Sequence, residues 1–331
     1  MNGSPRQERM QGVAYSLREL AESTRMPFEW PGAQAQKPKM KKDNPDETLS
    51  RKASPLVFEK DILSDLLEEK ASSLFLGRFS LTEVTAVLGK KNFFREAQAR
   101  RLWPLAFDLD STAYPVQRLR VFYEEKDPEK VVVDLKIREG RLAPKDYLRL
   151  SPEFFEHEHL VLEWLTLQNP RLSFSEKRPP LPGQQHPGLG LRKKVVDIFV
   201  YLARLLRKDG LLAFPAYFHN AVLFSRFFYF LNPEKLAEVL AIEKSFPKIP
   251  FKHLAWVVYL NCLRRGDGSI YEWKAQEQVY PIHKDIKGYF DSKGYKRVVK
   301  RSLRESSFTI DWDGYEKKLD ELIKIRQIGR L

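Results

Sequence analysis

The sequence has almost no cysteine. Its single cysteine, Cys262, excludes an internal disulfide and a Cys-rich zinc site, and it fits a reducing compartment. Long apolar runs are missing too, because charged or polar residues interrupt the densest stretches, 195–206 and 211–231. The first residues also lack the apolar core of a secretory signal. We therefore expect a cytoplasmic protein without a membrane span.

Positive charge, in contrast, is abundant. The 57 Lys and Arg residues exceed the 44 Asp and Glu residues, and the net charge is +13. This excess favours anionic partners such as nucleic acid, anionic lipid or a polyphosphate cofactor. It is spread over the short clusters 37–42, 192–194 and 296–304, so charge alone does not choose among these partners.

Composition and periodicity divide the chain into four parts. Residues 1–55 are rich in Pro, Gln, Ser and Lys and are expected to form a disordered basic tail. Residues 56–112 show helical spacing of apolar residues, as in Ile62–Leu67, and Ser80 with Glu83 has the spacing of a capping box. Residues 246–331 are expected to be mostly helical.

The part between them, residues 113–245, has the pattern of an α/β core. Three segments rich in β-branched and aromatic residues predict strands, and they are followed by a Pro-rich stretch and a strongly amphipathic segment that predicts a helix. A short apolar strand and a further helix or turn come next. The predicted strands are 118–123, 131–137, 160–166 and 211–214, and the predicted helix is 191–208.

A glycine turn precedes that helix in the segment Gln185–Gly190. Gly188 and Gly190 let the backbone approach a ligand closely, and the free N–H groups at the start of the helix face the same place. Arg192 and its two neighbouring lysines add positive charge to the first turn. We therefore expect an anion to bind there.

The motif of this turn narrows the choice of anion. No G-K-[ST] follows the glycines, which excludes a nucleotide P-loop, and the third glycine of a dinucleotide fingerprint is absent. The remaining pattern, Q-x-x-G-x-G before a helix, resembles the pyrophosphate loop of the GNAT acyltransferases. The resemblance covers roughly residues 119–233. It implies an α/β (α+β) fold with a mixed central sheet flanked by helices, with helical N-terminal and C-terminal extensions.

The resemblance also implies a cofactor, acetyl-CoA or another acyl-CoA, and residues to hold it. Asn220 would lie near the pantetheine arm. The residues that would bind the pyrophosphate are Gln185, Gly188, Leu189, Gly190, Leu191 and Arg192.

Catalytic candidates follow from the chemistry of acyl transfer, which needs a base to remove a proton from the attacking amine. Glu163, midway along the predicted strand 160–166, is the candidate base. The tyrosine that usually serves as the acid in the family is absent, since Phe224 and Ser225 stand at its place. Tyr229 or Tyr217 could replace it, and His186 and His219 flank the same site.

Two other motifs predict different chemistry. Asp108 and Asp110 in the segment FDLDST match the D-x-D-x-T signature, which resembles the haloacid dehalogenase phosphotransferases. His157 and His159 have strand spacing and could contribute to a metal site, but no other His or Cys lies near them in the sequence. We expect a polar turn there and no metal.

Together these observations predict an acetyl-CoA-dependent N-acyltransferase that acts on an unidentified small-molecule or protein amine. An alternative is a non-catalytic, degenerate GNAT-like module that binds a protein or nucleic acid through the basic clusters. A minor alternative is the phosphotransferase indicated by Asp108 and Asp110. The acyl acceptor and the oligomeric state stay open.

Overall fold

The computed structural model describes residues 74–142, 156–175 and 178–326. The predicted tail 1–55 and the helical pattern of Ile62–Leu67 lie outside these residues. All described residues belong to one compact unit, 68–331. None of the described helices is both long and apolar enough to cross a membrane.

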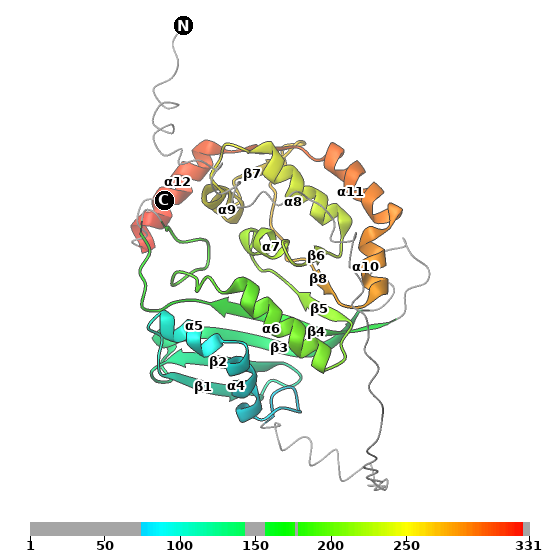
Figure 1. Cartoon of the computed structure of the whole chain (residues 1–331). Helices are drawn as coiled ribbons and strands as arrows, with labels where there is room; N and C mark the ends of the chain where they lie inside the picture. The colour runs from blue at the N-terminus through cyan, green and yellow to red at the C-terminus, as the bar shows by residue number, and fades with distance from the viewer. Residues whose placement is uncertain (1–73, 143–155, 176–177, 327–331) are drawn as a thin grey trace. The chain divides into compact units, whose positions relative to one another are not determined.

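A seven-stranded sheet forms the centre of this unit (Figure 1). Neighbouring strands are antiparallel except for β4 and β5, which run parallel. The sheet therefore is mixed, as predicted. In spatial order its strands are β1 (Leu105–Asp110), β2 (Gln117–Tyr123), β3 (Val131–Leu142), β4 (His157–Leu167), β5 (Gly210–Ala213), β8 (Gln278–Pro281) and β6 (Tyr229–Phe230).

Helices cover both faces of the sheet (Figure 1). The N-terminal helices and the long helix after the glycine turn pack on one face and form its apolar core with β2 to β5. These are α4 (Leu81–Lys90), α5 (Phe93–Ala99) and α6 (Arg192–Leu205). Two helices of the C-terminal part, α10 (Lys284–Asp291) and α11 (Lys293–Glu305), pack against the other face near β5 and β8.

The remaining helices and strands form another apolar core. The buried Trp256 and Tyr271 are among its largest side chains. The 3₁₀ turn η2 (Pro128–Lys130) joins β2 to β3. The other elements are α7 (Phe218–Phe224), α8 (Pro233–Ser245), α9 (Phe251–Tyr259), β7 (Leu263–Arg265), β9 (Phe308–Ile310) and α12 (Trp312–Arg326).

The structure confirms the predicted fold class, an α/β arrangement with a mixed central sheet flanked by helices. The capping box is also present, because Ser80 Oγ accepts from the Glu83 amide and the Glu83 carboxylate accepts from the Ser80 amide. Several strands were not predicted, because β1 lies within residues 56–112, which were expected to be helical, and β7, β8 and β9 lie within residues 246–331, which were expected to be mostly helical. β8 comes from the mostly helical region after residue 246, yet it lies between β5 and β6 in the central sheet.

The strand that carries Asp108 and Asp110 is the edge strand of an antiparallel ladder. A phosphotransferase of the haloacid dehalogenase type would need this motif in a Rossmann-like body of alternating strands and helices, which β1 to β3 do not form. Asp108 is held by Arg120 (3.1 Å) and Lys126 (3.2 Å), and Asp110 accepts from the Thr112 hydroxyl (2.7 Å). The fold therefore argues against the phosphotransferase alternative.

Two histidines are almost completely buried. His159 in β4 is 0% exposed and His219 in α7 is 2% exposed. Burial lowers the pKa of each imidazole to about 4, because a charged ring is poorly solvated there. Both side chains are therefore neutral in the folded protein at neutral pH.

We expect the protein to lose stability between pH 6.5 and pH 4. In this window the unfolded chain binds protons on His159 and His219 and the folded chain does not, so the free energy of unfolding falls as the pH falls. Each histidine contributes on the order of 3 kcal/mol to the loss. Urea unfolding at pH 7 and pH 4.5 measures this loss. In a His159→Gln variant the free energy of unfolding should differ less between the two pH values than in the wild type.

Candidate functional site

The two parallel strands of the sheet separate at their C-terminal ends. Pairing between β4 and β5 runs from His159 opposite Gly210 to Leu162 opposite Ala213 and then stops. β4 continues to Leu167, but the chain after β5 turns away toward α7. A cavity of about 240 Å³ lies where the two strands diverge. A split between parallel strands exposes backbone groups that a ligand can pair with.

Several segments of the chain line this cavity. They are the end of β4, the residues after β5, α7, the glycine turn, the start of α6 and Pro182–Gln184 of the Pro-rich stretch. The lining includes residues 162–168, 182–184, 186, 188–192, 195, 196, 213–217, 219, 220, 223 and 224.

The glycine turn is fastened to the end of β4. The Asn169 amide donates to the Pro187 carbonyl (2.8 Å), and the Leu189 amide donates to the Leu167 carbonyl (3.3 Å). Gly190 has φ of +72°, a conformation that disfavours other residues, and a Cβ there would have nothing within 4 Å. At Gly190 the space beside the backbone is therefore open.

The start of α6 has the polarity of an anion site. Leu191 is its N-cap and provides no side-chain acceptor, and the first turn contains no acidic residue. The first N–H groups of α6, which form the positive end of the helix dipole, therefore have no capping side chain. Arg192 lines the cavity next to them. Burial and the nearby Arg226 lower the pKa of Arg192, but a guanidinium stays charged at neutral pH.

Not all of the basic residues in this turn are available to a ligand. Lys194 Nζ lies 2.6 Å from Glu96 of α5, and Glu96 also pairs with Arg100. Arg100 Nε in turn donates to the Leu189 carbonyl (3.0 Å) and so ties the glycine turn to α5. Lys194 therefore holds the turn in place and does not face the cavity.

Glu163, the predicted base, lines the cavity from β4. One of its carboxylate oxygens accepts from Arg138 Nε at 2.6 Å, and the side chain is about one-third exposed. Asn220, which was predicted to lie near a pantetheine arm, also lines the cavity, from α7. The structure thus brings together residues that lie almost sixty positions apart in the sequence.

Tyr217 and His219 stand beside Asn220. Their rings stack with centroids 5.4 Å apart and an interplanar angle of 20°. A Cβ on Gly183 would come within 3 Å of the Tyr217 ring and hydroxyl, so a glycine is required there for the tyrosine to keep its place. The sequence analysis named both residues, but only their position in the cavity separates them from the many other aromatic residues nearby.

Two predicted site residues lie elsewhere. Gln185 is exposed and does not line the cavity, although Gln184 and His186 on either side of it do. Tyr229 lies in β6, where its ring stacks on Phe290 with centroids 4.8 Å apart, and burial raises its pKa. It lines none of this cavity, because β8 separates β6 from β5.

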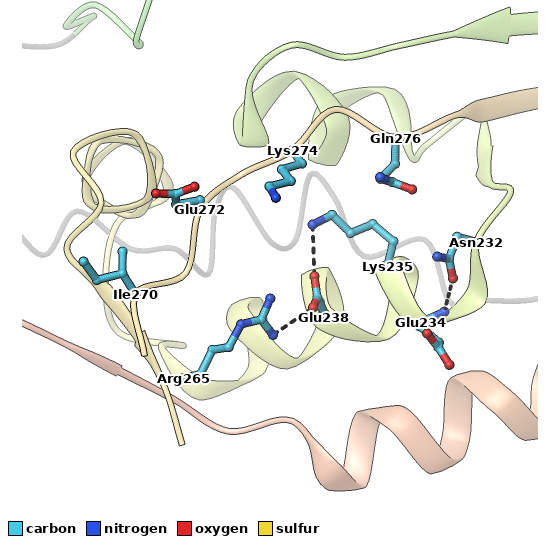
Figure 2. A pocket seen from close by; sticks show the side chains of 9 residues that line it. All are labelled: Asn232, Glu234, Lys235, Glu238, Arg265, Ile270, Glu272, Lys274 and Gln276. Carbon is cyan, nitrogen blue, oxygen red and sulfur yellow. Dashed lines mark hydrogen bonds and ion pairs between the residues drawn. The ribbon is translucent and has the colours of Figure 1, made fainter. Parts of the chain in front are cut away.

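Another cavity, of about 340 Å³, lies beside α8 (Figure 2). Lys235 projects into it and bonds to Glu238 (3.0 Å), which also bonds to Arg265 (2.9 Å). The lining holds three basic and three acidic residues, so its charges balance. We interpret this network as a structural ion-pair cluster that supports α8.

Comparison with known proteins does not assign this chain to a family. No protein-family model matches the sequence, and no curated protein matches it. A bacterial toxin structure is 10% identical and covers 54% of this chain and 73% of its own, with a TM-score of 0.28. The structure of a mutant form of KacT is 10% identical and covers 68% and 95%, with a TM-score of 0.26.

A third solved structure is AtaT complexed with acetyl-methionyl-tRNAfMet. It is 11% identical and covers 67% of this chain and 93% of its own, with a TM-score of 0.21. All three TM-scores are below 0.5, so neither the function nor the family of this chain follows from these likenesses.

Proposed function

We propose that this protein is an acyl-CoA-dependent N-acyltransferase that uses acetyl-CoA and an amine acceptor. The observation that carries the proposal is one cavity in which an uncapped helix N-terminus meets the divergent ends of two parallel strands. The helix end and Arg192 suit a diphosphate, and the strand edge suits the amides of a pantetheine arm. Bound acetyl-CoA would supply a thioester carbonyl for acyl transfer.

Some residues of the cavity would bind the cofactor, and others would transfer protons. The amides at Gly188, Gly190 and the first turn of α6 would hold the diphosphate with Arg192, and Asn220 would contact the arm. Glu163 would take a proton from the amine, directly or through one water molecule. We propose Tyr217 in place of Tyr229 as the acid for the leaving thiolate, because Tyr217 lines the cavity.

The test is a calorimetric titration of the purified protein with acetyl-CoA. We expect one molecule to bind with micromolar affinity, and CoA to compete with it. AMP, which lacks the diphosphate and the arm, should not compete at the same concentration. An absence of acetyl-CoA binding would contradict the proposal and favour the alternative of a non-catalytic binding module.

A second candidate function is polyanion binding, and α11 favours it. Its basic side chains are all exposed, while Tyr295 is buried and donates its hydroxyl to the Phe230 carbonyl (2.6 Å). Four of the basic residues form no ion pair with any described residue. These are Lys293, Arg297, Lys300 and Arg304. Such a row on one helix suits a phosphate backbone.

If α11 binds RNA, reversing charge on it should weaken that binding. We expect Arg297→Glu with Lys300→Glu to reduce the affinity for a 20-nucleotide single-stranded RNA, and to lower the salt slope by about 1.4, or roughly 0.7 for each lost phosphate contact. Lys317→Glu with Lys324→Glu on α12 makes the same change of charge and is the control. Equal losses in both double variants would mean that only net charge matters.

A further inference from the structure

The start of β4 meets the start of α10 at a cluster of metal-ligand side chains. His157, His283 and Asp285 each offer a ligand atom, and these three atoms lie within 4.8 Å of one another. The two imidazole rings have centroids 5.3 Å apart. His157 is buried, whereas His283 and Asp285 are partly exposed, so an ion could enter from the solvent side.

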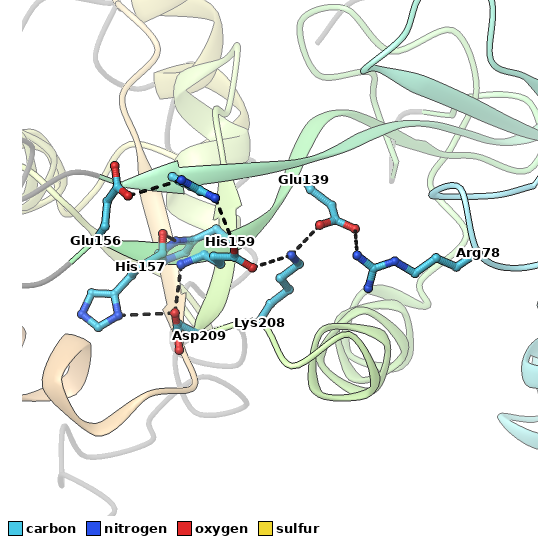
Figure 3. A network of polar contacts seen from close by, with 9 residues as sticks. Arg78, Glu139, Glu156, His157, His159, Lys208 and Asp209 are labelled. Carbon is cyan, nitrogen blue, oxygen red and sulfur yellow. Dashed lines mark hydrogen bonds and ion pairs between the residues drawn. The ribbon is translucent and has the colours of Figure 1, made fainter. Parts of the chain in front are cut away.

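The backbone around this cluster is firmly held. The Asp209 carbonyl accepts from the amides of both Ile282 and His283, each at 2.8 Å. The Asp209 amide donates to the Glu158 carbonyl (2.7 Å), and its carboxylate accepts from the Glu158 amide (2.9 Å). Asp209 thus joins three chain segments, and Figure 3 shows its contact with His157. These hydrogen bonds therefore hold the backbone next to His157 and His283 in place.

Two distances between side chains in this cluster suit metal binding. Asp209 Oδ2 lies 3.4 Å from His157 Nδ1, the place of a carboxylate that keeps the proton on Nδ1 and directs Nε2 to an ion. His283 Nδ1 lies 3.6 Å from Asp285 Oδ2, close to the ligand separation of about 3.3 Å in a tetrahedral zinc site. The bond from the Asp285 amide to His283 Nδ1 is long, at 3.3 Å, and an ion could replace it.

We propose that His157, His283 and Asp285 bind a divalent transition-metal ion of the zinc type. Two imidazoles and one carboxylate suit zinc or cobalt and do not suit magnesium or calcium, which prefer oxygen ligands alone. Water would fill the fourth position. The pair His157 and His159, considered from the sequence, is not the basis of this site, because His159 Nδ1 bonds instead to the His157 carbonyl (3.0 Å).

The role of this ion would be structural. It would tie α10 and the end of β8 to the first residue of β4, and so fix the C-terminal part against the sheet. Five positions separate His157 from Leu162, the first residue of β4 that lines the cavity, which is about 17 Å along an extended strand. The site is therefore independent of the proposed acyltransferase function. Because the unfolded chain lacks this arrangement, the ion should stabilise the folded state.

The test uses the untagged full chain, freed of metal with a chelator and titrated with Zn²⁺ by calorimetry. We expect one equivalent to bind and the thermal unfolding midpoint to rise, with EDTA reversing the rise. Co²⁺ should give the visible absorption bands of a tetrahedral site. Absence of Zn²⁺ binding by the wild-type chain would overturn the proposal.

Three variants distinguish Zn²⁺ binding at this site from nonspecific binding at the protein surface. His283→Asn keeps a side-chain acceptor at the N-cap of α10 but removes the imidazole, and we expect the Zn²⁺ affinity to fall at least about tenfold. Asp285→Asn should have the same effect. Asp291→Asn removes an exposed carboxylate from the other end of the same helix and should bind like wild type. Equal affinity in all three variants would also overturn the proposal.

Discussion

A Gly190→Glu variant is expected to lose at least a hundredfold in acetyl-CoA affinity, close to 3 kcal/mol. The reason is electrostatic as well as steric. Gly190 lines the cavity in which the proposed diphosphate binds, and a Cβ added there would have nothing within 4 Å. A carboxylate there would stand near a second anion, and two like charges about 4 Å apart near a protein surface repel by about 4 kcal/mol. Calorimetric titration measures the loss directly.

The control for this variant is Gly268→Glu. Gly268 has φ of +83° and also has nothing within 4 Å of an added Cβ, but it does not line the cavity. Both variants carry a similar backbone strain of about 1–2 kcal/mol, so they should lose similar thermal stability. Acetyl-CoA affinity should fall only in Gly190→Glu. Unchanged affinity in that variant would place the cofactor elsewhere.

A Glu163→Gln variant should lower kcat by roughly a hundredfold to ten-thousandfold while the acetyl-CoA affinity stays near the wild-type value. This is the usual range for loss of a general base. The amide keeps the size of the side chain and an oxygen acceptor for Arg138, so the ion pair becomes a hydrogen bond. That pair is partly exposed and contributes about 1 kcal/mol at most to stability. Steady-state kinetics, once an amine acceptor is found, test the prediction.

The matched control is Glu156→Gln. Glu156 also holds an arginine, Arg141 (3.4 Å), but it lies just before β4, at the opposite end of the strand from the cavity. Its loss should change neither kcat nor cofactor binding. If Glu163→Gln kept full activity, Glu163 would only orient Arg138, and the base would have to be sought among other cavity residues such as His219.

Local pattern was enough to predict most elements of the core. The alternation in 118–123, 131–137 and 160–166 corresponds to β2, β3 and β4, and the amphipathic stripe of 191–208 corresponds to α6. Each of these elements extends or shortens by a few residues in the structure. The glycine turn was equally visible, because two glycines before a helix with a basic first turn form a local feature.

Long-range pairing was not visible in the same way. β8 is only four residues long, and its partners β5 and β6 lie some fifty to seventy residues earlier in the chain. No local period indicates such a partner. This pairing decides which tyrosine lies at the site. Because β8 lies between β5 and β6, Tyr229 is away from the cavity, whereas Tyr217 lines it.

By itself, therefore, the sequence determined the α/β class, the order of the predicted core elements and the position of the glycine turn before α6. These depend on periodicity, propensity and glycine geometry within about fifteen residues. Only the tertiary structure decided which side chains share the cavity, that Arg138 holds Glu163, and that His157 meets His283 and Asp285. Such contacts join residues that are distant in the chain, and they depend on strand order and helix packing, which no local pattern specifies.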